Sequence, residues 1–438
     1  RQRRTRGMTL RPRTVALTVV VALIGIAASW RGISPLTWQL PAVVIAMLVL
    51  AEFNALRGPA LTLSVSQPPQ LGLGTDHAAS VAITNAGTTA CTLRACPVPP
   101  SGVATARRDF QLELAPGEST EHAFTLSGTT LGRHAWPRQP VEIRGRYGLA
   151  DWIRYVPVTA VSRVVPNRRP VASPSRGLAW SGQRPVLNVG PASEETRGLR
   201  AYSPGDPPAA IDWKASARQR ELMVRESTHT EHIEIVVALD AGQASGLACG
   251  DLTVLGHSAN VAAQLMATAE LRGDRAGLLV FADRVLGCLP AGHGPAHQRR
   301  LQELLATTTS TGAESNPLPA IMTLSRVAQR RSLIVLFSQL HSVEVGSQLY
   351  RAVRLLRPQH LPLIVALRDP DIDALAVQPA SRWVDPYMSL AAIEYRRDVK
   401  AISQRLQRLG ADIVETVPDE LGTAVMRRYQ QLRRLRRV

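Results

Sequence analysis

The pattern of apolar and polar positions changes several times along the chain, and each change predicts a different structure. Near the N-terminus, two segments without charged residues, Thr14–Ser29 and Leu36–Ala51, lie close together. Each is somewhat shorter than the ~20 residues that span a bilayer, but Trp30 and Trp38 suit the membrane interface and extend the usable length. Residues 1–57 are therefore predicted to form a basic N-terminus and a two-helix transmembrane hairpin, with the lipid bilayer as a partner.

The distribution of arginine predicts how this hairpin is oriented. Six arginines precede the first apolar segment, whereas the loop between the two segments carries only Arg31. The positive-inside rule then places the N-terminus and the soluble domains in the cytoplasm, so we expect a protein of the inner (cytoplasmic) membrane with two spans. A cleaved signal peptide is the alternative for the first segment, although the second segment would still remain as an anchor after cleavage.

Residues 58–161 show a different pattern, in which short runs of alternating or β-branched residues are separated by turn-forming residues. Examples are LTLSVS from Leu61, AASVAIT from Ala78 and EHAFTLS from Glu121, with turn formers such as Pro116-Gly117 between them. About seven short strands at this spacing are typical of an antiparallel β-sandwich. No catalytic constellation is visible in this region, so an interaction or spacer domain is expected.

Residues 162–226 are predicted to be a connector that ends in a signature segment. Within it, the stretch YSPGDPPAAIDWKASAR, Tyr202–Arg218, combines charge, Pro, Gly and Trp. Pro204-Gly205 suits the centre of a type II turn, and Asp212 is placed to cap a short helix through Ala217. The candidate signature or interaction residues are Tyr202, Pro204, Gly205, Asp206, Asp212, Trp213, Lys214, Arg218, Arg225 and Glu226.

The charges of this signature segment nearly cancel, which favours an internal ion-pair network over a catalytic site. We expect the segment to be a joint that fixes the connector to the first strand of the next domain. Partner binding by the same residues is the second interpretation.

Residues 227–438 alternate strongly apolar runs with helical patterns. IEIVVALD, Ile233–Asp240, is nearly continuously apolar and ends at a carboxylate, as buried parallel strands do. AGLLVFA, SLIVLFS and LPLIVAL are similar, and helical patterns lie between them or follow them, the last from about Leu390 to Leu409. This alternation predicts a doubly wound α/β domain, in which ligands bind beyond the carboxyl ends of the strands.

Composition narrows the choice of partners and cofactors. The net charge of +17 comes from 51 basic residues, of which only Lys214 and Lys400 are lysine. A bias toward arginine throughout the chain makes the charge a weak indication of nucleic-acid binding, which we do not expect. The four cysteines, Cys91, Cys96, Cys249 and Cys288, show no zinc-site spacing and are expected to be reduced.

The signature segment also resembles a known family. GLRAYSPGDPPAAIDWKASARQRELMVRE, from Gly198, followed by a strand ending in Asp240, is similar to the domain of unknown function 58 family, and GRYGLADWIRY from Gly145 matches a further element of it. The resemblance implies two N-terminal spans, a β-rich middle and a von Willebrand factor type A-like C-terminal domain. It also implies an association with MoxR-type AAA+ ATPases and with cell-envelope or stress functions.

The same resemblance implies a Mg²⁺ site, which type A domains build from a D-x-S-x-S motif and ligands on later loops. Asp240 matches the motif, but Gly242 and Ala244 replace its serines and Gln339 replaces a later acidic residue. Thr311, Glu314 and Ser315 lie in a threonine-rich loop that cannot be aligned with the expected threonine ligand. Because Mg²⁺ prefers six oxygen ligands, we expect a degenerate site at Asp240 and no cofactor.

No phosphate-binding loop, nucleophile elbow or zinc-protease motif occurs in the sequence. We therefore expect a non-enzymatic, membrane-anchored scaffold that binds a protein, such as a MoxR-type AAA+ ATPase. The predicted docking surface is the edge of the sheet around Asp240, Ser338, Gln339 and the threonine-rich loop. The alternatives are a metal-dependent hydrolase or nucleic-acid-acting enzyme, and a purely structural envelope protein.

Overall fold

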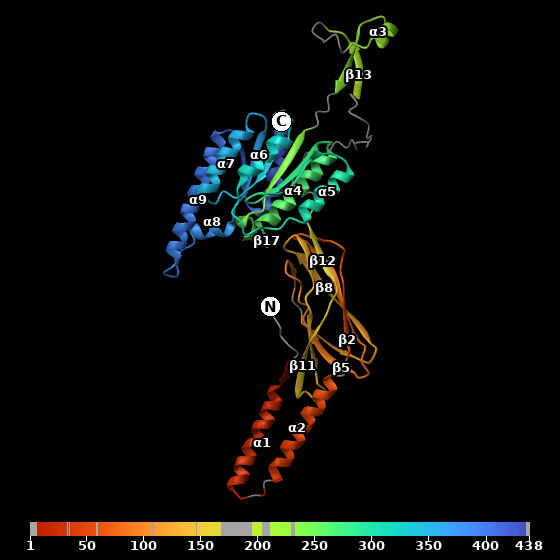
Figure 1. The fold of residues 1–438 in the computed structure, drawn as a ribbon, viewed down its shortest axis with the longest axis vertical. Coiled ribbons are helices and arrows are strands. Elements are labelled where there is room, and N and C mark those ends of the chain that lie inside the picture. Colours follow the sequence, from red (N-terminus) through yellow and green to blue (C-terminus); the bar gives the residue numbers. More distant parts are fainter. Residues whose placement is uncertain are drawn as a thin grey trace.

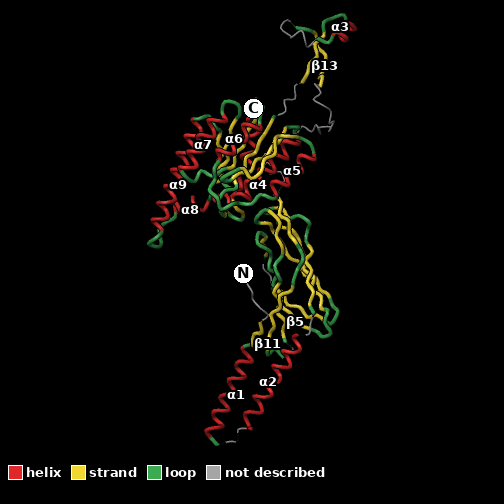
Figure 2. Tube along the Cα trace, viewed as in Figure 1, coloured by secondary structure: helices red, strands yellow, loops and turns green. Residues whose placement is uncertain are grey.

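The structure is a computed structural model of the chain. It describes residues 7–32, 34, 36–57, 60–106, 109–145, 147–167, 195–203, 211–228 and 233–434. A helical hairpin lies at one end, a β-rich region in the middle and a mixed α/β region at the other end (Figure 1). Figure 2 shows the same division by secondary structure.

The two apolar segments near the N-terminus form the helices α1, Pro12–Trp30, and α2, Leu36–Arg57. Across the described residues, however, no helix combines the length and the apolar character that crossing a membrane requires. The predicted transmembrane hairpin, and with it the predicted inner-membrane localisation with two spans, is therefore wrong. The uncharged part of each helix rises only about 24 Å, against a hydrocarbon core of about 30 Å.

The middle region consists of three sheets whose strand orders are β1-β11-β10-β5-β7, β2-β4-β8-β6 and β3-β12-β9. Alternating inward side chains such as Val81, Ile83, Leu93 and Ile143 form its core. The strands are β1 Gly7–Leu10, β2 Leu61–Ser66, β3 Leu71–Gly72, β4 Asp76–Asn85, β5 Cys91–Ala95, β6 Val103–Thr105, β7 Phe110–Leu114, β8 Ser119–Gly128, β9 Gly132–Ala135, β10 Gln139–Arg144, β11 Ala150–Val156 and β12 Val161–Val165.

Two features of these sheets differ from the predicted antiparallel sandwich. β12 pairs in parallel with β3, with Val164 opposite Leu71, so that sheet is mixed. β1 was not predicted as a strand, yet it pairs with β11 immediately before α1 begins. Both differences depend on pairing between segments that are far apart in sequence, which local patterns do not encode.

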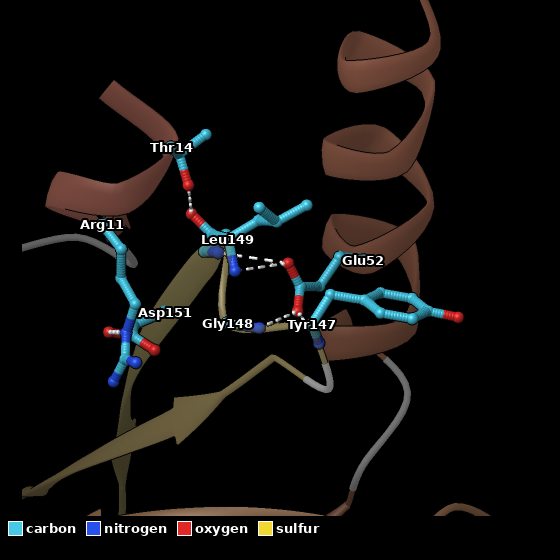
Figure 3. Close-up of polar contacts among 8 residues, drawn as sticks. Arg11, Thr14, Glu52, Tyr147, Gly148, Leu149 and Asp151 are labelled. Carbon is cyan, nitrogen blue, oxygen red and sulfur yellow. Dashed lines mark hydrogen bonds and ion pairs between the residues drawn. The ribbon is translucent and has the colours of Figure 1, made fainter. Parts of the chain in front are cut away.

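A single buried carboxylate joins the helical hairpin to the β-rich region (Figure 3). Glu52 of α2 is only 3% exposed. Its Oε1 accepts hydrogen bonds from the backbone N–H groups of Tyr147 and Gly148 at 2.7 and 3.1 Å, and its Oε2 accepts from those of Leu149 and Ala150 at 3.0 and 3.2 Å. Three of these donors lie in the turn between β10 and β11, and Ala150 is the first residue of β11, so the carboxylate fixes this turn against α2.

The start of α1 is attached to the same turn. Arg11 Nε donates to Asp151 Oδ2 at 2.8 Å, and Thr14 Oγ1 donates to the Leu149 carbonyl at 2.5 Å (Figure 3). Gly145 is required beside this junction, because a Cβ at that position would lie 2.0 Å from Glu52 Oε1. Both helices of the hairpin are thus bonded to one turn of the sandwich.

The C-terminal region is built on a six-stranded sheet of order β19-β18-β15-β20-β21-β22, in which β19 is antiparallel and the other strands are parallel. The strands are β15 Glu234–Asp240, β18 Arg275–Phe281, β19 Val285–Gly292, β20 Ser332–Phe337, β21 Leu361–Leu367 and β22 Asp412–Thr416, and a short ribbon pairs β16 Ala248–Cys249 with β17 Leu252–Thr253. The helices are α4 Val254–Leu271, α5 Pro295–Ala306, α6 Pro317–Val327, α7 Val343–Leu356, α8 Pro370–Val377, α9 Asp385–Arg408 and α10 Pro418–Arg434, with a 3₁₀ turn at Gln243–Gly246.

Both faces of this sheet are buried, as the continuous apolar runs predict. Along β15, Ile235, Val237 and Leu239 pack with the cluster that includes residues of α4, α5 and α10. Val236 and Ala238 point the other way and pack with residues of α6, α7 and α9. The antiparallel β19 was not predicted, so the sheet is mixed rather than wholly parallel.

The β-rich and α/β regions share a packed contact at the start of α4. Leu73 belongs to the same buried cluster as Leu252, and a Cβ at Gly74 would lie 3.1 Å from the Leu252 side chain. On α4, Asn260 Oδ1 accepts from the backbone N–H of Asn167 at 2.7 Å, and its Nδ2 donates to the Leu73 carbonyl at 3.4 Å. Asn260 thereby holds the loop before β4 and the chain after β12 on one helix.

We expect Glu52→Ala to destabilise the junction by about 3 kcal/mol, because four backbone donors lose a buried, charged acceptor. Hydrogen exchange of the amides of residues 147–150 should become faster, and thermal unfolding should shift to lower temperature. Glu118→Ala is the matched control, since that exposed carboxylate accepts from one backbone amide, Ala115. Unchanged exchange at residues 147–150 in Glu52→Ala would contradict the assignment.

Candidate functional site

The carboxyl edge of the six-stranded sheet is organised around Asp240, the last residue of β15. Its Oδ1 accepts from the backbone N–H of Gly242 at 2.8 Å. Its Oδ2 accepts from the hydroxyls of Ser315 at 2.6 Å and Ser338 at 3.1 Å. Ser315 comes from the loop before α6 and Ser338 directly follows β20, so three separate segments meet at one carboxylate.

Asp240 is almost completely buried, with 8% of its surface exposed. Burial raises the pKa of this carboxyl above its usual value, and the hydrogen bonds from Ser315, Gly242 and Ser338, with the nearby His341, oppose that shift only in part. The site therefore favours the protonated form of the carboxyl more strongly than water does.

The residues around Asp240 do not fit a Mg²⁺ ion. Asp240 is the one carboxylate of the set, and the hydroxyls of Ser315 and Ser338 donate to it instead of facing an open ligand position. A Cβ at Gly242 would lie 3.0 Å from Ser315 Cβ and 3.1 Å from Asp240 Oδ1, so a serine at 242 would be crowded. The described residues contain no group of three or more His, Cys, Asp or Glu side chains that could hold a metal.

The threonine-rich loop lies beside this site but uses its polar groups internally. Both the backbone N–H and the Oγ1 of Thr311 donate to the Ala241 carbonyl, at 2.7 and 3.2 Å. Gln243 N–H donates to the Ala313 carbonyl at 2.8 Å, while Glu314 is exposed. Ser315 is the residue of this loop that reaches Asp240, and Gln339 is half-buried next to Ser338.

Thiol chemistry is not favoured in the same region. Cys91, Cys249 and Cys288 are free thiols. Burial, followed by the negative charges of Asp369 and Asp371, raises the pKa of Cys249 to about 11. A thiol with so high a pKa carries little thiolate at neutral pH, so Cys249 is unsuited to act as a nucleophile.

The signature segment forms a small unit of β13, Glu195–Ala201, α3, Trp213–Gln219, and β14, Met223–Thr228. Asp212 caps α3, as predicted, and accepts from the backbone N–H groups of Lys214 and Ala215 at 3.0 Å each. Ser216 Oγ accepts from Met223 N–H at 2.8 Å, which holds α3 against β14. In Figure 1 this unit stands apart from the six-stranded sheet.

The structure locates only some of the predicted signature residues. Pro204, Gly205 and Asp206 lie outside the described residues, as do the side chains of Arg225 and Glu226. Tyr202 is 37% exposed and Trp213 is 68% exposed. Lys214 and Arg218 are exposed, and neither forms an ion pair with another described residue. The ion-pair network and the joint to the first strand of the sheet both stay predictions.

A second surface at the carboxyl edge was missed by the sequence reasoning. α8 begins just after β21 ends, and α9 returns to the sheet, so the end of α8 and the start of α9 project from the domain (Figure 1). We call residues 377–393 the α8–α9 arm. The large apolar side chains exposed on it are Val377 (78%), Trp383 (82%), Tyr387 (70%), Met388 (41%), Leu390 (55%) and Ile393 (50%).

The tip and the base of the arm are both held by polar contacts. At the tip, Asp385 accepts from the N–H groups of Ser381 and Arg382 at 2.9 and 2.7 Å. These bonds, the one from Arg382 being the stronger, lower the pKa of Asp385 to about 2. At the base, Asp373 forms ion pairs with Arg368 and Arg396 at 3.0 and 3.2 Å. The arm is therefore a defined structure, although its apolar side chains have no cover within the described chain.

A signal for this arm was present in the sequence. Trp383, Tyr387 and Leu390 are spaced four and three residues apart, which is the spacing of one side of a helix. In the structure Tyr387 and Leu390 lie on α9, and Trp383 lies in the turn just before it. The helix was predicted to begin only near Leu390, and α8 was not predicted. An aromatic stripe that begins before the predicted helix start would have indicated both the longer helix and its apolar side.

Comparison with known protein families gave a match in the second half of the chain. Residues 198–411 match the model of the family described as Protein of unknown function DUF58. The resemblance predicted from the segment that starts at Gly198 is thus confirmed for these residues, whereas the Gly145 element lies outside the match. Uncharacterized proteins of Mycobacterium tuberculosis and Mycobacterium bovis are each 26% identical over 269 residues, which are 57% of this chain and 82% of each relative.

Among solved structures, the chain is similar to the CARDB domain of a Pyrococcus furiosus protein, with 16% sequence identity and a TM-score of 0.18. The match covers 25% of this chain and 96% of that domain. It is also similar to a FixG-related protein from Vibrio parahaemolyticus, with 8% sequence identity and a TM-score of 0.17. That match covers 24% of this chain and 95% of the other.

We expect Asp240→Asn to stabilise the protein relative to the natural chain as the pH rises. The folded-state pKa of Asp240 is raised above its unfolded value, so burial is tolerated at low pH and becomes costly as the carboxyl ionises. The difference in melting temperature between variant and natural chain should therefore grow in favour of the variant from pH 4 to pH 7.5. Asp398→Asn, at an exposed position on α9, is the control. A difference that is constant with pH would count against this interpretation.

We expect Asp212→Ala to destabilise α3 by about 1 kcal/mol, because the first-turn amides lose their capping acceptor. Hydrogen exchange of the Lys214 and Ala215 amides should become several times faster. Lys214→Ala leaves the cap in place and serves as the control. If both variants exchange alike, Asp212 is not the residue that holds this helix.

Proposed function

We propose that this protein is a non-enzymatic interaction scaffold whose α/β region binds another protein, a MoxR-type AAA+ ATPase, in cell-envelope or stress physiology. The observation that carries the proposal is the α8–α9 arm, an ordered projection with six large, exposed apolar side chains at the carboxyl edge of the sheet. Apolar groups gathered in this way on a surface are typical of protein-binding sites.

The composition of the arm supports a protein partner. Trp and Tyr are enriched at the energetic centres of protein interfaces, because they bury a large area and retain a polar tip. Full burial of one such side chain contributes about 2 kcal/mol. Trp383 and Tyr387 together could thus supply much of the binding energy of a micromolar complex, which requires about 8 kcal/mol in total.

The arm moves the proposed docking surface away from Asp240. Asp240, Ser315 and Ser338 are each less than 9% exposed, and their polar atoms bond to one another. A partner carboxylate would find neither a metal nor a free donor among these three residues. We therefore assign Asp240 to holding the three loops at the sheet edge, beside the surface that the partner contacts.

The enzymatic alternatives have less support. A metal-dependent hydrolase or a nucleic-acid-acting enzyme requires several carboxylates or imidazoles that converge on one point. At the carboxyl edge, Asp240 is the buried carboxylate among the loops, and it is internally bonded, whereas Glu314 on the neighbouring loop is exposed. A purely structural role remains the second candidate and gives no reason for an exposed aromatic arm.

The von Willebrand factor type A-like identity of the α/β region belongs to the same proposal. It is supported by parallel strands with helices on both faces and by an aspartate at the end of β15. The MoxR-type partner is what the resemblance of the signature segment implies, and residues 198–411 match the model of the family that this segment resembles.

The test measures binding of the full chain to the MoxR-type ATPases of the source organism. We expect the double substitution Trp383→Ser and Tyr387→Ser to weaken binding by at least about tenfold, equal to about 1.4 kcal/mol. Leu271→Ser is the matched control, since Leu271 is 69% exposed at the end of α4. A second readout is Trp383 fluorescence, which should shift to shorter wavelength as the ring is buried.

Two results would overturn the proposal. In one, none of the MoxR-type ATPases binds the full chain. In the other, binding occurs but is equally strong in the double variant and the Leu271 control, which would place the contact elsewhere. Trp213→Ser then tests the signature segment, whose Trp213 is the other strongly exposed aromatic side chain of the matched residues.

A further inference from the structure

The strand β2, Leu61–Ser66, is the end strand of its four-stranded sheet. It pairs with β4 along one edge, from Leu61 opposite Asn85 to Ser66 opposite Ser80. Its other edge is not paired with any strand in the described part of the chain. Since backbone groups alternate in direction along a strand, about half of the N–H and C=O groups of β2 face this open edge.

β2 lacks the features by which proteins normally protect an open edge. Its sequence LTLSVS contains no charge, Pro or Gly. Several other end strands carry such features: β7 has Glu113, β9 has Arg133, β19 has Pro290 and β22 has Glu415. β6, at the opposite end of the same sheet, carries none, but at three residues it is too short to offer a long edge. Because an uncharged, regular edge readily accepts another strand, β2 is suited to strand addition.

A groove runs beside this open edge. It has a volume of about 440 Å³, and its lining includes Ser64, Val65 and Gln67 on the β2 side and Ala160 and Val161 on the other. Gln67 closes one end, where its Nε2 donates to the Val161 carbonyl at 3.0 Å and its Oε1 accepts from Ser162 Oγ at 2.7 Å. Val161 is 46% exposed and forms part of the far wall.

The sandwich core beneath β2 is incompletely covered. Leu63 and Val65 alternate inward from β2 but remain only half-buried, unlike the nearly fully buried Val81 and Ile83 on β4. They also line a small internal cavity of about 10 Å³. Val65 thus lies between the groove and the core, where an aliphatic side chain entering from the groove would complete its packing.

We propose that β2 accepts one extended peptide of a partner protein, with uncharged residues and aliphatic side chains at every second position. The peptide backbone pairs with the open edge of β2, and its inward side chains cover Leu63 and Val65. Six residues extend about 20 Å, which matches the length of β2. This site lies on the β-rich region and is independent of the proposed function of the α8–α9 arm.

The groove favours a single strand over a second copy of this chain. A second copy would bring β4 of its own sheet along with its β2, and Ala160 and Val161 stand on the far side of the groove where that strand would have to pass. A free peptide has no such neighbour. The hydroxyl side chains of Thr62, Ser64 and Ser66 point outward from the sheet and do not obstruct the open edge of β2.

The probe is a soluble synthetic peptide, Lys-Thr-Val-Thr-Val-Thr-Val-Lys, added to the full chain. Hydrogen exchange of the amides in residues 61–66 should slow by about tenfold, because strand addition pairs the open edge. A control peptide with Pro in place of the central Val should have no effect, since Pro lacks the N–H that the pairing needs.

Val161→Arg places a bulky charge on the far wall and should abolish the effect of the peptide. Val98→Arg is the matched control, because Val98 is an exposed valine of the same region, 38% exposed, that does not line the groove. Melting temperatures of both variants verify that the sandwich remains folded.

Three outcomes would overturn the proposal. The first is no protection of β2 at millimolar peptide. The second is equal protection in the natural chain and in Val161→Arg. The third is protection that appears without peptide and grows with protein concentration, which would identify a second copy as the occupant of the edge.

Discussion

The fold depends on a negative charge buried where the helical hairpin meets the sandwich. A carboxylate at 3% exposure would be costly if its oxygens were unpaired, yet Glu52 receives four backbone amides from one turn. These bonds give the N–H groups of Tyr147, Leu149 and Ala150 an acceptor, and the N–H of Gly148 is shared between Glu52 and the Gly145 carbonyl. Hairpin and turn therefore stabilise each other, and neither has the same environment without the other. The Arg11 contact with Asp151 adds a second charged bond on the α1 side of the same turn.

A buried carboxylate also organises the carboxyl edge of the α/β sheet, where its partners are one backbone amide and two serine hydroxyls. Asp240 is the endpoint of one strand, but its partners, Gly242, Ser315 and Ser338, come from three segments. The hydroxyl that a serine at position 242 would offer is supplied by Ser315 instead, and the absence of a Cβ at Gly242 leaves room for it. An arrangement that resembles a metal site in sequence is thus closed by hydrogen bonds within the protein, and these bonds hold three loops together at the sheet edge.

Sequence patterns predicted the elements whose signal is local and missed those that depend on distant partners. The apolar run that ends at Asp240 and the cap at Asp212 were predictable, because burial on both faces and N-capping leave clear signatures. β1, β19 and the parallel pairing of β12 with β3 were not, since they require partners far along the chain. The membrane assignment failed because Trp30 and Trp38 were expected to make up for the short apolar segments, whereas no described helix has the required length and apolar character. At the candidate site, Asp240 was predictable from the end of its strand, but the contributions of Ser315 and Ser338 depend on loop geometry.

The helix α9 has a mechanical consequence. Its C-terminal half is buried against the sheet through Val399, Ile402 and Leu406, while its N-terminal half carries the exposed side chains of Tyr387, Met388, Leu390 and Ile393. A rigid rod fixed at one end transmits any torque on its free end to its support. A force on the projecting end of α9 would therefore reach the β22 edge of the sheet directly, and Asn260 bonds the same region to the sandwich through Leu73 and Asn167.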